Sequence, residues 1–465
     1  MRQNVGITEQ IAHFVVNVRA REVPEEVKET AKEHLLDGLA TMLGGVPEAA
    51  SRLIRRHVAR LGGRREATIL GTRLKAPCQH AALANAVQGH VLDYDDTQLA
   101  TSETRPFGHL THPTTPVLAA SLATAERLHS TGMDLLEAYI AGVEVACRLA
   151  DAIDASHYLN GFHPTGTLAA FGATAACCRL LDLDETRIRW ALGITASLAS
   201  GVRANRGTMT KSLNAGRAAE NGVLAARLAS EGFSASSKVF EDPMGYLSAA
   251  SQNAVDRKLL VFGHPYFFSR PGVAIKPYAC AVVLHPSLDV ILDLVVRHDI
   301  KPQQVRKVRV GMSSYSAAPL VYPRPATGLQ GKFSMPFSAA VAILDRKVAL
   351  DQYTDHKVRH PKTVALMKRV ELYYASETER FGHEQARANV EIFLKDGRIY
   401  RERATVARGH PMKPLSRQAL EEKFRACASR CLEARAIQRL ISSVRDIEHA
   451  SSVSVLVNRM IGKGS

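Results

Sequence analysis

The chain has 465 residues, more than the roughly 250–300 at which a single hydrophobic core stops growing, so two domains are expected. Hydrophobic residues make up 46% and charged residues 23% of the sequence, as in globular proteins, and no stretch approaches the about 18 consecutive apolar residues of a membrane span. The formal net charge of +15 comes from dispersed basic residues without interleaved stacking aromatics, which argues against nucleic-acid binding and favours attraction of small anions.

The cysteines and the first residues of the chain bear on its compartment. Seven cysteines are scattered without a disulfide framework, and Cys427 and Cys431 have no Cys/His pair nearby to complete a zinc site. Residues 1–20 lack the apolar core and the cleavage site of a signal peptide, and they resemble the start of an amphipathic helix. We therefore expect reduced thiols and a cytoplasmic protein.

The first 268 residues are predicted to be mostly helical. Pro24 precedes two glutamates, as is typical of a helix start, and Val27, Ala31 and Leu35 then recur at the spacing of one buried helix face. Segment 67–77 is the exception, because it has the pattern of a short hairpin that turns at Gly71-Thr72. Further helices are expected at 47–61, 80–93, 114–129, 134–154, 166–181, 185–199 and 214–231.

The pattern changes after about residue 268. Alternating apolar residues predict strands at 305–312 and 370–374, and 388–406 is predicted to be a hairpin because Asp396-Gly397 supplies a positive-φ turn. Helices are expected between these strands and again from about Leu415 onward. The predicted fold class is α+β, with a large all-helical domain built from both chain ends and an inserted α+β lid domain. The predicted boundaries are 1–268 for the helical domain, completed by 408–465, and 269–407 for the lid.

Three carboxylates crowd the sequence HVLDYDDT, which begins at residue 90: Asp93, Asp95 and Asp96. On a continued helix, Asp93 and Thr97 would share one face. Repulsion between the carboxylates would raise the pKa of at least one of them and leave a base poised nearer neutrality. The alternative is an acidic cluster that is solvated or caps the next element. No Asp, Glu or His set has a convincing metal-binding spacing, so no metal ion is expected.

Two histidines precede a proline and then a predicted helix. His112 stands before Pro113, and His163, in GFHPTG, stands before Pro164. The positive end of a helix dipole lowers the proton affinity of a histidine, so both imidazoles are expected to be neutral at pH 7. They would then suit proton transfer or hydrogen bonding. The competing interpretation is a capping or surface histidine, because proline is common in a first helical turn.

Several cations could bind an anionic substrate. Lys211 precedes a small-residue helix, where a cation is unfavourable unless an anion lies between it and the helix start, so it is either solvent-exposed or a carboxylate clamp. Arg203 and Arg206 lie just before it, and Lys276 stands at the start of the lid. Unless the arginines form surface ion pairs, these cations suit a substrate with two or three carboxylates.

Taken together, six segments resemble the MmgE/PrpD family, which includes 2-methylcitrate dehydratase-like proteins, cis-aconitate decarboxylase and an iminodisuccinate epimerase. They occur in the family's order over about residues 80–345, and with the flanking helices the resemblance covers essentially the whole chain. The segments are HVLDYDDT, THPTTPVLAASLATAE, GFHPTG, GTMTKSLNAGRAAENG, IKPYACAVVLHPSLD and GKFSMPFSAAVAI.

The resemblance implies a homodimer of large helical domains, each with an α+β lid, and an active site between the two domains. It also implies a small di- or tricarboxylate substrate, and no metal ion, iron–sulfur cluster or organic cofactor. Tyr278, which lies two residues after Lys276, is a further expected substrate-binding residue. The positions that match the family's active site are Asp93, Thr97, His112, His163, Lys211 and Lys276.

Two departures from the family pattern bear on the substrate. Fourteen residues, 98–111, separate Thr97 from His112, more than in the decarboxylase-like members of the family, and this long loop is expected to reach the rim of the site and to alter the substrate. Lys211 is flanked by threonine and serine instead of the Ser-Trp-Lys motif of the methylcitrate dehydratase-like members, and Asn214 stands where a histidine is frequent. The loop residues expected at the rim are Glu103, Arg105 and His109.

The activities of the family share proton movement at a carbon next to a carboxylate. Lys211 and Lys276 would stabilise the developing negative charge, Asp93 and His112 would form the base and acid pair, and His163 would be a second acid. The leading hypothesis is a cofactor-independent lyase, a dehydratase of a citrate- or 2-methylcitrate-like hydroxy-polycarboxylate. An epimerase or a decarboxylase is the alternative within the enzyme class. Outside that class, the alternative is a binding protein without turnover.

Overall fold

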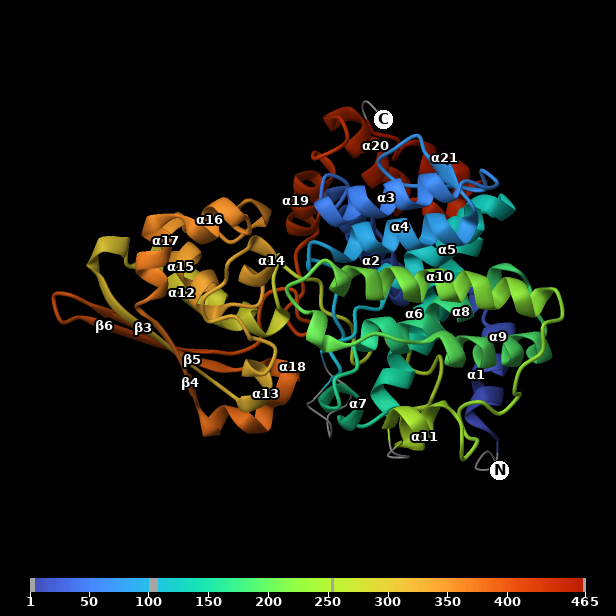
Figure 1. The fold of residues 1–465 in the computed structure, drawn as a ribbon, viewed down its shortest axis with the longest axis horizontal. Coiled ribbons are helices and arrows are strands. Elements are labelled where there is room, and N and C mark those ends of the chain that lie inside the picture. The colour runs from blue at the N-terminus through green and yellow to red at the C-terminus, as the bar shows by residue number, and fades with distance from the viewer. Residues whose placement is uncertain (1–4, 100–107, 252–254, 463–465) are drawn as a thin grey trace.

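The computed structural model describes residues 5–99, 108–251 and 255–462, which form a helical body and, beside it, a smaller α+β unit (Figure 1). The first and the last helices, α1 (Ile7–Asn17) and α21 (Val453–Asn458), both belong to the body. The mainly helical α+β fold class expected from the sequence is therefore confirmed. The exact residues at which one domain passes into the other stay a prediction.

The body consists of long helices packed side by side. Helix α6 packs on α8, and α10 packs on both α4 and α8. The expected short hairpin is present as β1 (Ala67–Thr68) paired antiparallel with β2 (Lys75–Ala76), with Gly71 at a φ of 74° in its turn. The helices of this part are α2 (Glu25–Gly44), α3 (Ala49–Leu61), α4 (Cys78–His90), α5 (Thr114–Leu128), α6 (Gly132–Ala152), α7 (Ser156–Leu159), α8 (Pro164–Leu180), α9 (Glu185–Leu198), α10 (Thr210–Ser230) and α11 (Tyr246–Ser251).

The C-terminal helices complete the body. After the α+β unit the chain returns, and α19 (Arg417–Ala428) and α20 (Ala434–Arg445) pack against α2 near the start of the chain, while α21 packs on α5. In Figure 1 these helices, in red, lie beside the blue N-terminal ones. The body is thus built from both ends of the chain. No helix of the described ranges is long and apolar enough to cross a bilayer.

The α+β unit contains a four-stranded sheet of order β4-β3-β5-β6. Strand β3 (Val305–Met312) runs parallel to β4 (Val370–Tyr374) and antiparallel to β5 (Ala388–Leu394), which forms the expected hairpin with β6 (Ile399–Ala404). Buried and partly exposed residues alternate along β5, because α12 covers one face of the sheet there. The helices are α12 (His285–Arg297), α13 (Ser314–Ala317), α14 (Gly328–Gly331), α15 (Met335–Asp345), α16 (Asp355–Arg359), α17 (Pro361–Met367) and α18 (Gly382–Gln385).

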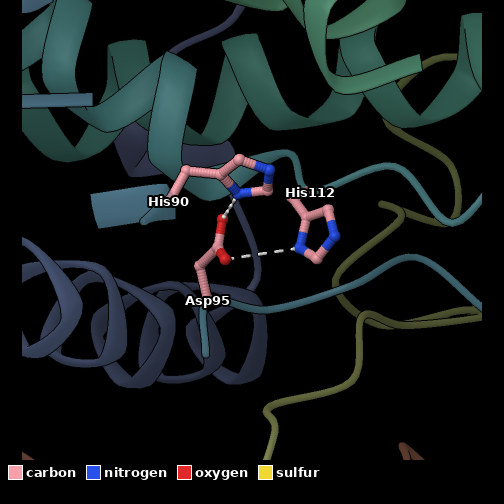
Figure 2. A group of neighbouring side chains, drawn as sticks. All are labelled: His90, Asp95 and His112. Carbon is pink, nitrogen blue, oxygen red and sulfur yellow. Dashed lines mark hydrogen bonds and ion pairs between the residues drawn. The ribbon is translucent and has the colours of Figure 1, made fainter. Parts of the chain in front are cut away.

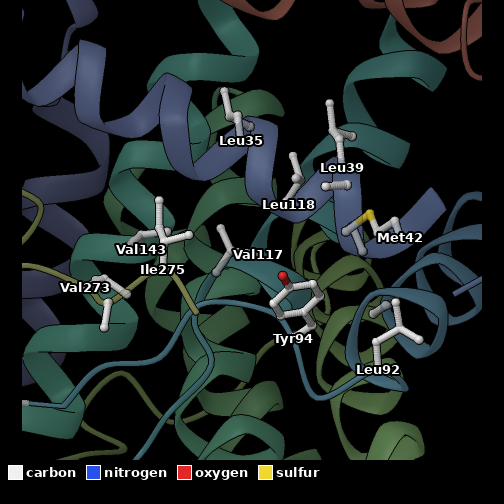
Figure 3. Close-up of a cluster of buried hydrophobic side chains, with 14 of the residues drawn as sticks. Leu35, Leu39, Met42, Leu92, Tyr94, Val117, Leu118, Val143, Val273 and Ile275 are labelled. Carbon is white, nitrogen blue, oxygen red and sulfur yellow. The ribbon is translucent and has the colours of Figure 1, made fainter. Parts of the chain in front are cut away.

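The segment after α4 and the segment that leads from the body into the α+β unit meet in the hydrophobic core. Leu92 and Tyr94 follow α4, and Val273 and Ile275 lead into the α+β unit; all four belong to one buried cluster with side chains of α2, α5 and α6 (Figure 3). The backbones of the two segments are joined between Thr97 and Ala274 by two hydrogen bonds of 2.8 and 2.9 Å. The core therefore fixes residues near 93 next to residues near 276.

Candidate active site

Asp93 lies at the centre of the predicted cluster, but it does not continue a helix. Helix α4 ends at His90, and Asp93 takes a left-handed backbone conformation with a φ of 50°. Residues other than glycine rarely adopt this conformation, because it brings the side chain too close to the backbone. The prediction that Asp93 and Thr97 share one helix face is therefore wrong, since the chain turns away after His90.

Two ammonium groups converge on Asp93. Lys211 Nζ lies 2.9 Å from Asp93 Oδ1. Lys276 Nζ lies 3.4 Å from the same oxygen and donates to the Asp93 carbonyl oxygen at 3.0 Å. Lys211 is in the first turn of α10, and only 12% of its side chain is exposed. It is thus bound to a carboxylate and not solvent-exposed, and Asp93 is the anion that a lysine at this helix start requires.

The pKa values of Asp93 and Asp95 differ from the sequence-based prediction. Burial by itself raises the pKa of Asp93, but Lys211 and Lys276 together hold it well below its usual value. Burial likewise opposes ionisation of Asp95, and the nearby histidines outweigh it and hold the pKa far below its usual value. The prediction of a raised pKa is therefore wrong for Asp93 and for Asp95, because each carboxylate faces cations or imidazoles and not a second carboxylate. A carboxylate with so low a pKa is a poor proton acceptor.

Asp96, the third carboxylate of the cluster, stabilises the fold. Its Oδ2 lies 2.7 Å from His34 Nδ1 and accepts a hydrogen bond from the Thr114 hydroxyl at 2.5 Å. Its Oδ1 accepts from the backbone N–H of Thr114, the first residue of α5, at 3.3 Å. For Asp96, the alternative of a carboxylate that caps the next element is the one that the structure supports.

His90, the first residue of HVLDYDDT, is a member of the site that the sequence did not single out. Its Nδ1 lies 2.8 Å from Asp95 Oδ2 and its Nε2 lies 2.7 Å from Lys211 Nζ (Figure 2). Because ionised Asp95 can only accept, Nδ1 carries the hydrogen, and Nε2 accepts from the Lys211 ammonium group. A spacing of five residues is not a helical one, so only the turn after α4 brings His90 and Asp95 together.

His112 faces the second carboxylate oxygen of Asp95 (Figure 2). Its Nδ1 is 3.5 Å from Asp95 Oδ1 and 3.3 Å from the Thr97 hydroxyl, and its ring meets that of His90 edge-on at 4.7 Å. Burial lowers the pKa of His112 well below its usual value, although Asp95 acts to raise it. The imidazole is therefore neutral at pH 7, as expected, but the main cause is burial and not the helix dipole.

His163 is the third imidazole of the cluster. It precedes Pro164, the first residue of α8, and its ring lies 5.6 Å from that of His90. Its Nδ1 lies 3.1 Å from Asn214 Nδ2, so the amide donates to Nδ1 and the imidazole hydrogen is on Nε2. Burial, followed by the positive charge of Lys211, lowers the pKa of His163 well below its usual value. Asn214, noted as a departure from the family pattern, therefore sets the tautomer of this histidine.

A small pocket opens beside these groups, between the body and the α+β unit. His90, Asp93 and Lys211 line it from the body, and Lys332 and Phe333 line it from the α+β unit. Asp93 Oδ2 is buried and has no hydrogen-bond partner within the described residues, so this carboxylate retains a free acceptor. The arrangement combines two ammonium groups, an ionised carboxylate and neutral imidazoles at the boundary of the two units.

The structure does not bring Arg203 and Arg206 into this cluster. The Arg203 guanidinium stacks on the Tyr158 ring, 3.4 Å from its centroid, and bonds to the carbonyl oxygen of that residue. Arg206 donates to the carbonyl oxygens of Arg203 and Ala318. Both side chains are thus held by neutral partners, and neither forms an ion pair with another of the described residues. Their role in substrate binding stays a prediction.

Tyr278 and the loop residues are likewise outside the cluster. The Tyr278 hydroxyl donates to Asp289 at 2.5 Å and accepts from Arg408 at 2.6 Å, so its substrate-binding role also stays a prediction. His109 is buried, and its Nε2 donates to the Ile153 carbonyl oxygen at 2.8 Å. The two remaining loop residues of the prediction lie outside the described residues: Glu103 and Arg105.

His90, Asp95 and His112 form a group whose donor atoms lie within 4.8 Å of one another, close enough to be tested as a metal site. In the structure these atoms bond to each other and, through His90, to the Lys211 ammonium. A divalent ion would have to displace those bonds next to two positive charges, which is electrostatically unfavourable. The donor set therefore fits a hydrogen-bonded network better than a metal centre.

Comparison with known proteins identifies the family. The MmgE/PrpD N-terminal domain matches residues 9–257, and the MmgE/PrpD C-terminal domain matches residues 278–448. The chain therefore belongs to the MmgE/PrpD family.

Its curated relatives include cis-aconitate decarboxylases. The chain is 27% identical to the cis-aconitate decarboxylase of Homo sapiens, over 98% of this chain and 95% of that protein. It is 26% identical to those of Mus musculus, over 98% and 94%, and of Aspergillus terreus, over 97% and 95%. These matches support an enzyme of the lyase class, and they favour the decarboxylase alternative over the dehydratase.

Proposed function

We propose that this protein is a cofactor-independent decarboxylase that acts on a small unsaturated tricarboxylate of the cis-aconitate type. The observation that carries the proposal is a neutral, buried imidazole, that of His112, in one cluster with the ammonium groups of Lys211 and Lys276. The cis-aconitate decarboxylase relatives support this choice among the chemistries of the family. Fixed cations bind substrate carboxylates, and a neutral imidazole next to them can take up and deliver a proton.

Lys211 and Lys276 are the proposed carboxylate-binding groups. Both ammonium groups already face Asp93, so their positions are set before substrate arrives. Preorganised charges in a water-poor site stabilise developing negative charge more strongly than charges that must first reorient. Asp93 then orients the two lysines and limits their mutual repulsion. Its low pKa makes it unsuitable as the base of the pair that it was expected to form with His112.

The proposed reaction breaks the bond between a carbon and its carboxylate. Carbon dioxide leaves, and the electron pair moves through the adjacent double bond onto a conjugated carboxylate held by the lysines. A proton is then added to carbon, so each turnover takes up one proton. His112 is the proposed proton donor, with His163 as the second candidate, and such a group typically contributes about 10²–10⁴ in rate. The negative charges of the bound substrate would raise the pKa of His112 and favour its protonation.

Proton NMR of the EDTA-treated enzyme in D₂O tests the proposal. Citrate, 2-methylcitrate, cis-aconitate and iminodisuccinate are offered separately. We expect cis-aconitate to lose one carboxylate as carbon dioxide and the product to carry one deuterium on carbon. Interconversion of citrate or 2-methylcitrate with an alkene, without loss of carbon dioxide, would support the dehydratase instead. Deuterium exchange alone would support an epimerase, and no reaction of any compound by the folded protein would contradict the decarboxylase proposal.

A further inference from the structure

Lys332 is a buried lysine that the proposed chemistry does not use. It follows α14 in the α+β unit, and its Nζ donates to the carbonyl oxygen of Leu92 at 2.6 Å and to that of Ala279 at 2.9 Å. Burial lowers the pKa of Lys332 to about 8. A buried amine is costly unless it is hydrogen-bonded, so both carbonyl contacts are needed to retain it.

Lys423, in the C-terminal part of the chain, makes an equivalent pair of contacts. It lies on α19, and its Nζ donates to the carbonyl oxygen of Tyr94 at 2.8 Å and to that of Lys276 at 2.9 Å. An ion pair of 2.5 Å with Asp37 compensates its charge in the core. This ammonium group thus contacts three oxygens from three different parts of the chain, two by hydrogen bonds and one by an ion pair.

The two lysines bridge the same two segments, 92–97 and 274–279. Leu92 and Tyr94 are the immediate neighbours of Asp93, and each of their carbonyl oxygens is held by one of the lysines. The second carbonyl of each lysine belongs to 274–279, the segment that carries Lys276. The Tyr94 hydroxyl adds a bond to the Pro277 carbonyl oxygen at 3.0 Å.

We propose that Lys332 and Lys423 are positioning residues that clamp segment 92–97 to segment 274–279, and so set the distance between Asp93 and Lys276. The clamp holds Asp93 from both sides in its left-handed conformation. Lys332 comes from the α+β unit and Lys423 from the C-terminal part of the body. The site is therefore complete only when both of these parts are packed against segments 92–97 and 274–279. The catalytic consequence rests on the proposed function, whereas the clamp itself does not.

Amide hydrogen exchange of the full chain, read by mass spectrometry, tests the clamp in Lys332→Met and in Lys423→Met. Because Lys423→Met leaves Asp37 buried without a counter-charge, it is also made together with Asp37→Asn. Lys32→Met is the matched control: Lys32 is another buried lysine, and it bonds to the Arg445 carbonyl oxygen and to Glu448, away from both segments. We expect faster exchange in peptides spanning 91–98 and 273–280 in the clamp variants, but not in the control.

Turnover of cis-aconitate supplies the second measurement. Displacement of groups by about 1 Å can cost on the order of 100-fold in rate, so we expect kcat to fall by about 10- to 100-fold in the clamp variants, with a smaller change in KM. Unchanged exchange in both segments, or equal exchange in Lys32→Met, would overturn the clamp. If the wild-type protein shows no turnover, the proposed function fails, and the exchange result still decides the clamp.

Discussion

At the scale of single residues, Lys211 connects Asp93 with the hydrogen-bonded pair of His90 and Asp95. Its ammonium group bonds to Asp93 and to Nε2 of His90, and His90 in turn bonds to Asp95. The pKa of Lys211 is lowered by burial, while Asp93 acts to raise it. A cation in this position can attract a substrate carboxylate and also keep the neighbouring imidazoles neutral.

Lys211→Ala is expected to lower kcat/KM for cis-aconitate by about 100-fold or more, because it removes a preorganised positive charge from the site. Steady-state kinetics measure the loss. Arg217→Ala is the matched control, since Arg217 lies on the same helix and its side chain is half exposed. A folded Lys211→Ala protein with wild-type turnover would remove this lysine from the proposed mechanism.

The neutral imidazoles make stability depend on pH. Burial lowers the pKa values of His90, His112 and His163 below the usual 6.5, so the unfolded chain binds more protons than the folded one below that pH. Their contribution to stability is therefore fully present above about pH 6.5 and is lost as the pH falls toward their folded-state pKa values. Asp37 has the opposite effect on stability. Burial raises its pKa to about 6, so the folded chain binds this proton more readily than the unfolded chain as the pH falls.

Thermal melts of the wild type and of His163→Asn between pH 7.5 and pH 5.5 test this linkage. We expect the wild-type Tm to fall more steeply with decreasing pH than that of His163→Asn, because the variant has one histidine fewer to protonate on unfolding. Asp37 is the same in both proteins, so the comparison isolates His163. His13→Asn controls for the loss of a histidine, since His13 is exposed. Equal slopes of Tm against pH for the wild type and His163→Asn would contradict the lowering of the His163 pKa by burial.

At the scale of secondary-structure elements, the position of His163 depends on how closely α8 approaches α6. Gly172 of α8 faces Gly142 of α6, and a Cβ on Gly172 would lie 2.4 Å from the Gly142 carbonyl oxygen. That atom belongs to the backbone, so it cannot move aside as a flexible side chain can. A larger residue must therefore push α8 away from α6, and the helix start beside His163 moves with it.

Gly172→Ala is expected to lower the free energy of unfolding by about 1–3 kcal/mol, as overpacking of a close-packed core does. Denaturant melts measure this loss, and a fall in kcat/KM would report the shift of His163. Gly44→Ala is the control, because the three atoms nearest to a Cβ there belong to the side chains of Cys427 and Leu92, at 3.0 Å and beyond. Equal destabilisation by the two substitutions would contradict a specific helix contact.

At the scale of the whole molecule, the site depends on the N-terminal part of the body, on the link to the α+β unit and on the C-terminal helices. The first helices and the segment after α4 supply Asp93 and His112, the link to the α+β unit supplies Lys276, and the C-terminal helix α19 supplies Lys423. Parts far apart in sequence therefore meet only when the body is complete. The homodimer implied by the family resemblance stays a prediction at this scale.

Helix and strand patterns could be predicted because they are local. The hairpin at Asp396-Gly397 and the start of α8 at Pro164 follow from short-range rules, and both are present. The end of α4 was misplaced, because the left-handed turn at Asp93 is stabilised by distant lysines and leaves no local signal. His90 was missed for the same reason, although it opens the HVLDYDDT motif.

The sequence by itself determined the mainly helical α+β fold, the family and the residue types of the site, because these follow from periodicity and ordered motifs. The tertiary structure alone decided the charge state of each group. Asp93 meets Lys211 across 118 residues of sequence and Lys276 across 183, and these contacts hold its pKa well below the usual value, where the sequence alone predicted a raised pKa for at least one of the crowded carboxylates. A pKa depends on burial and on the charges that surround a group in space, and only the folded chain defines both.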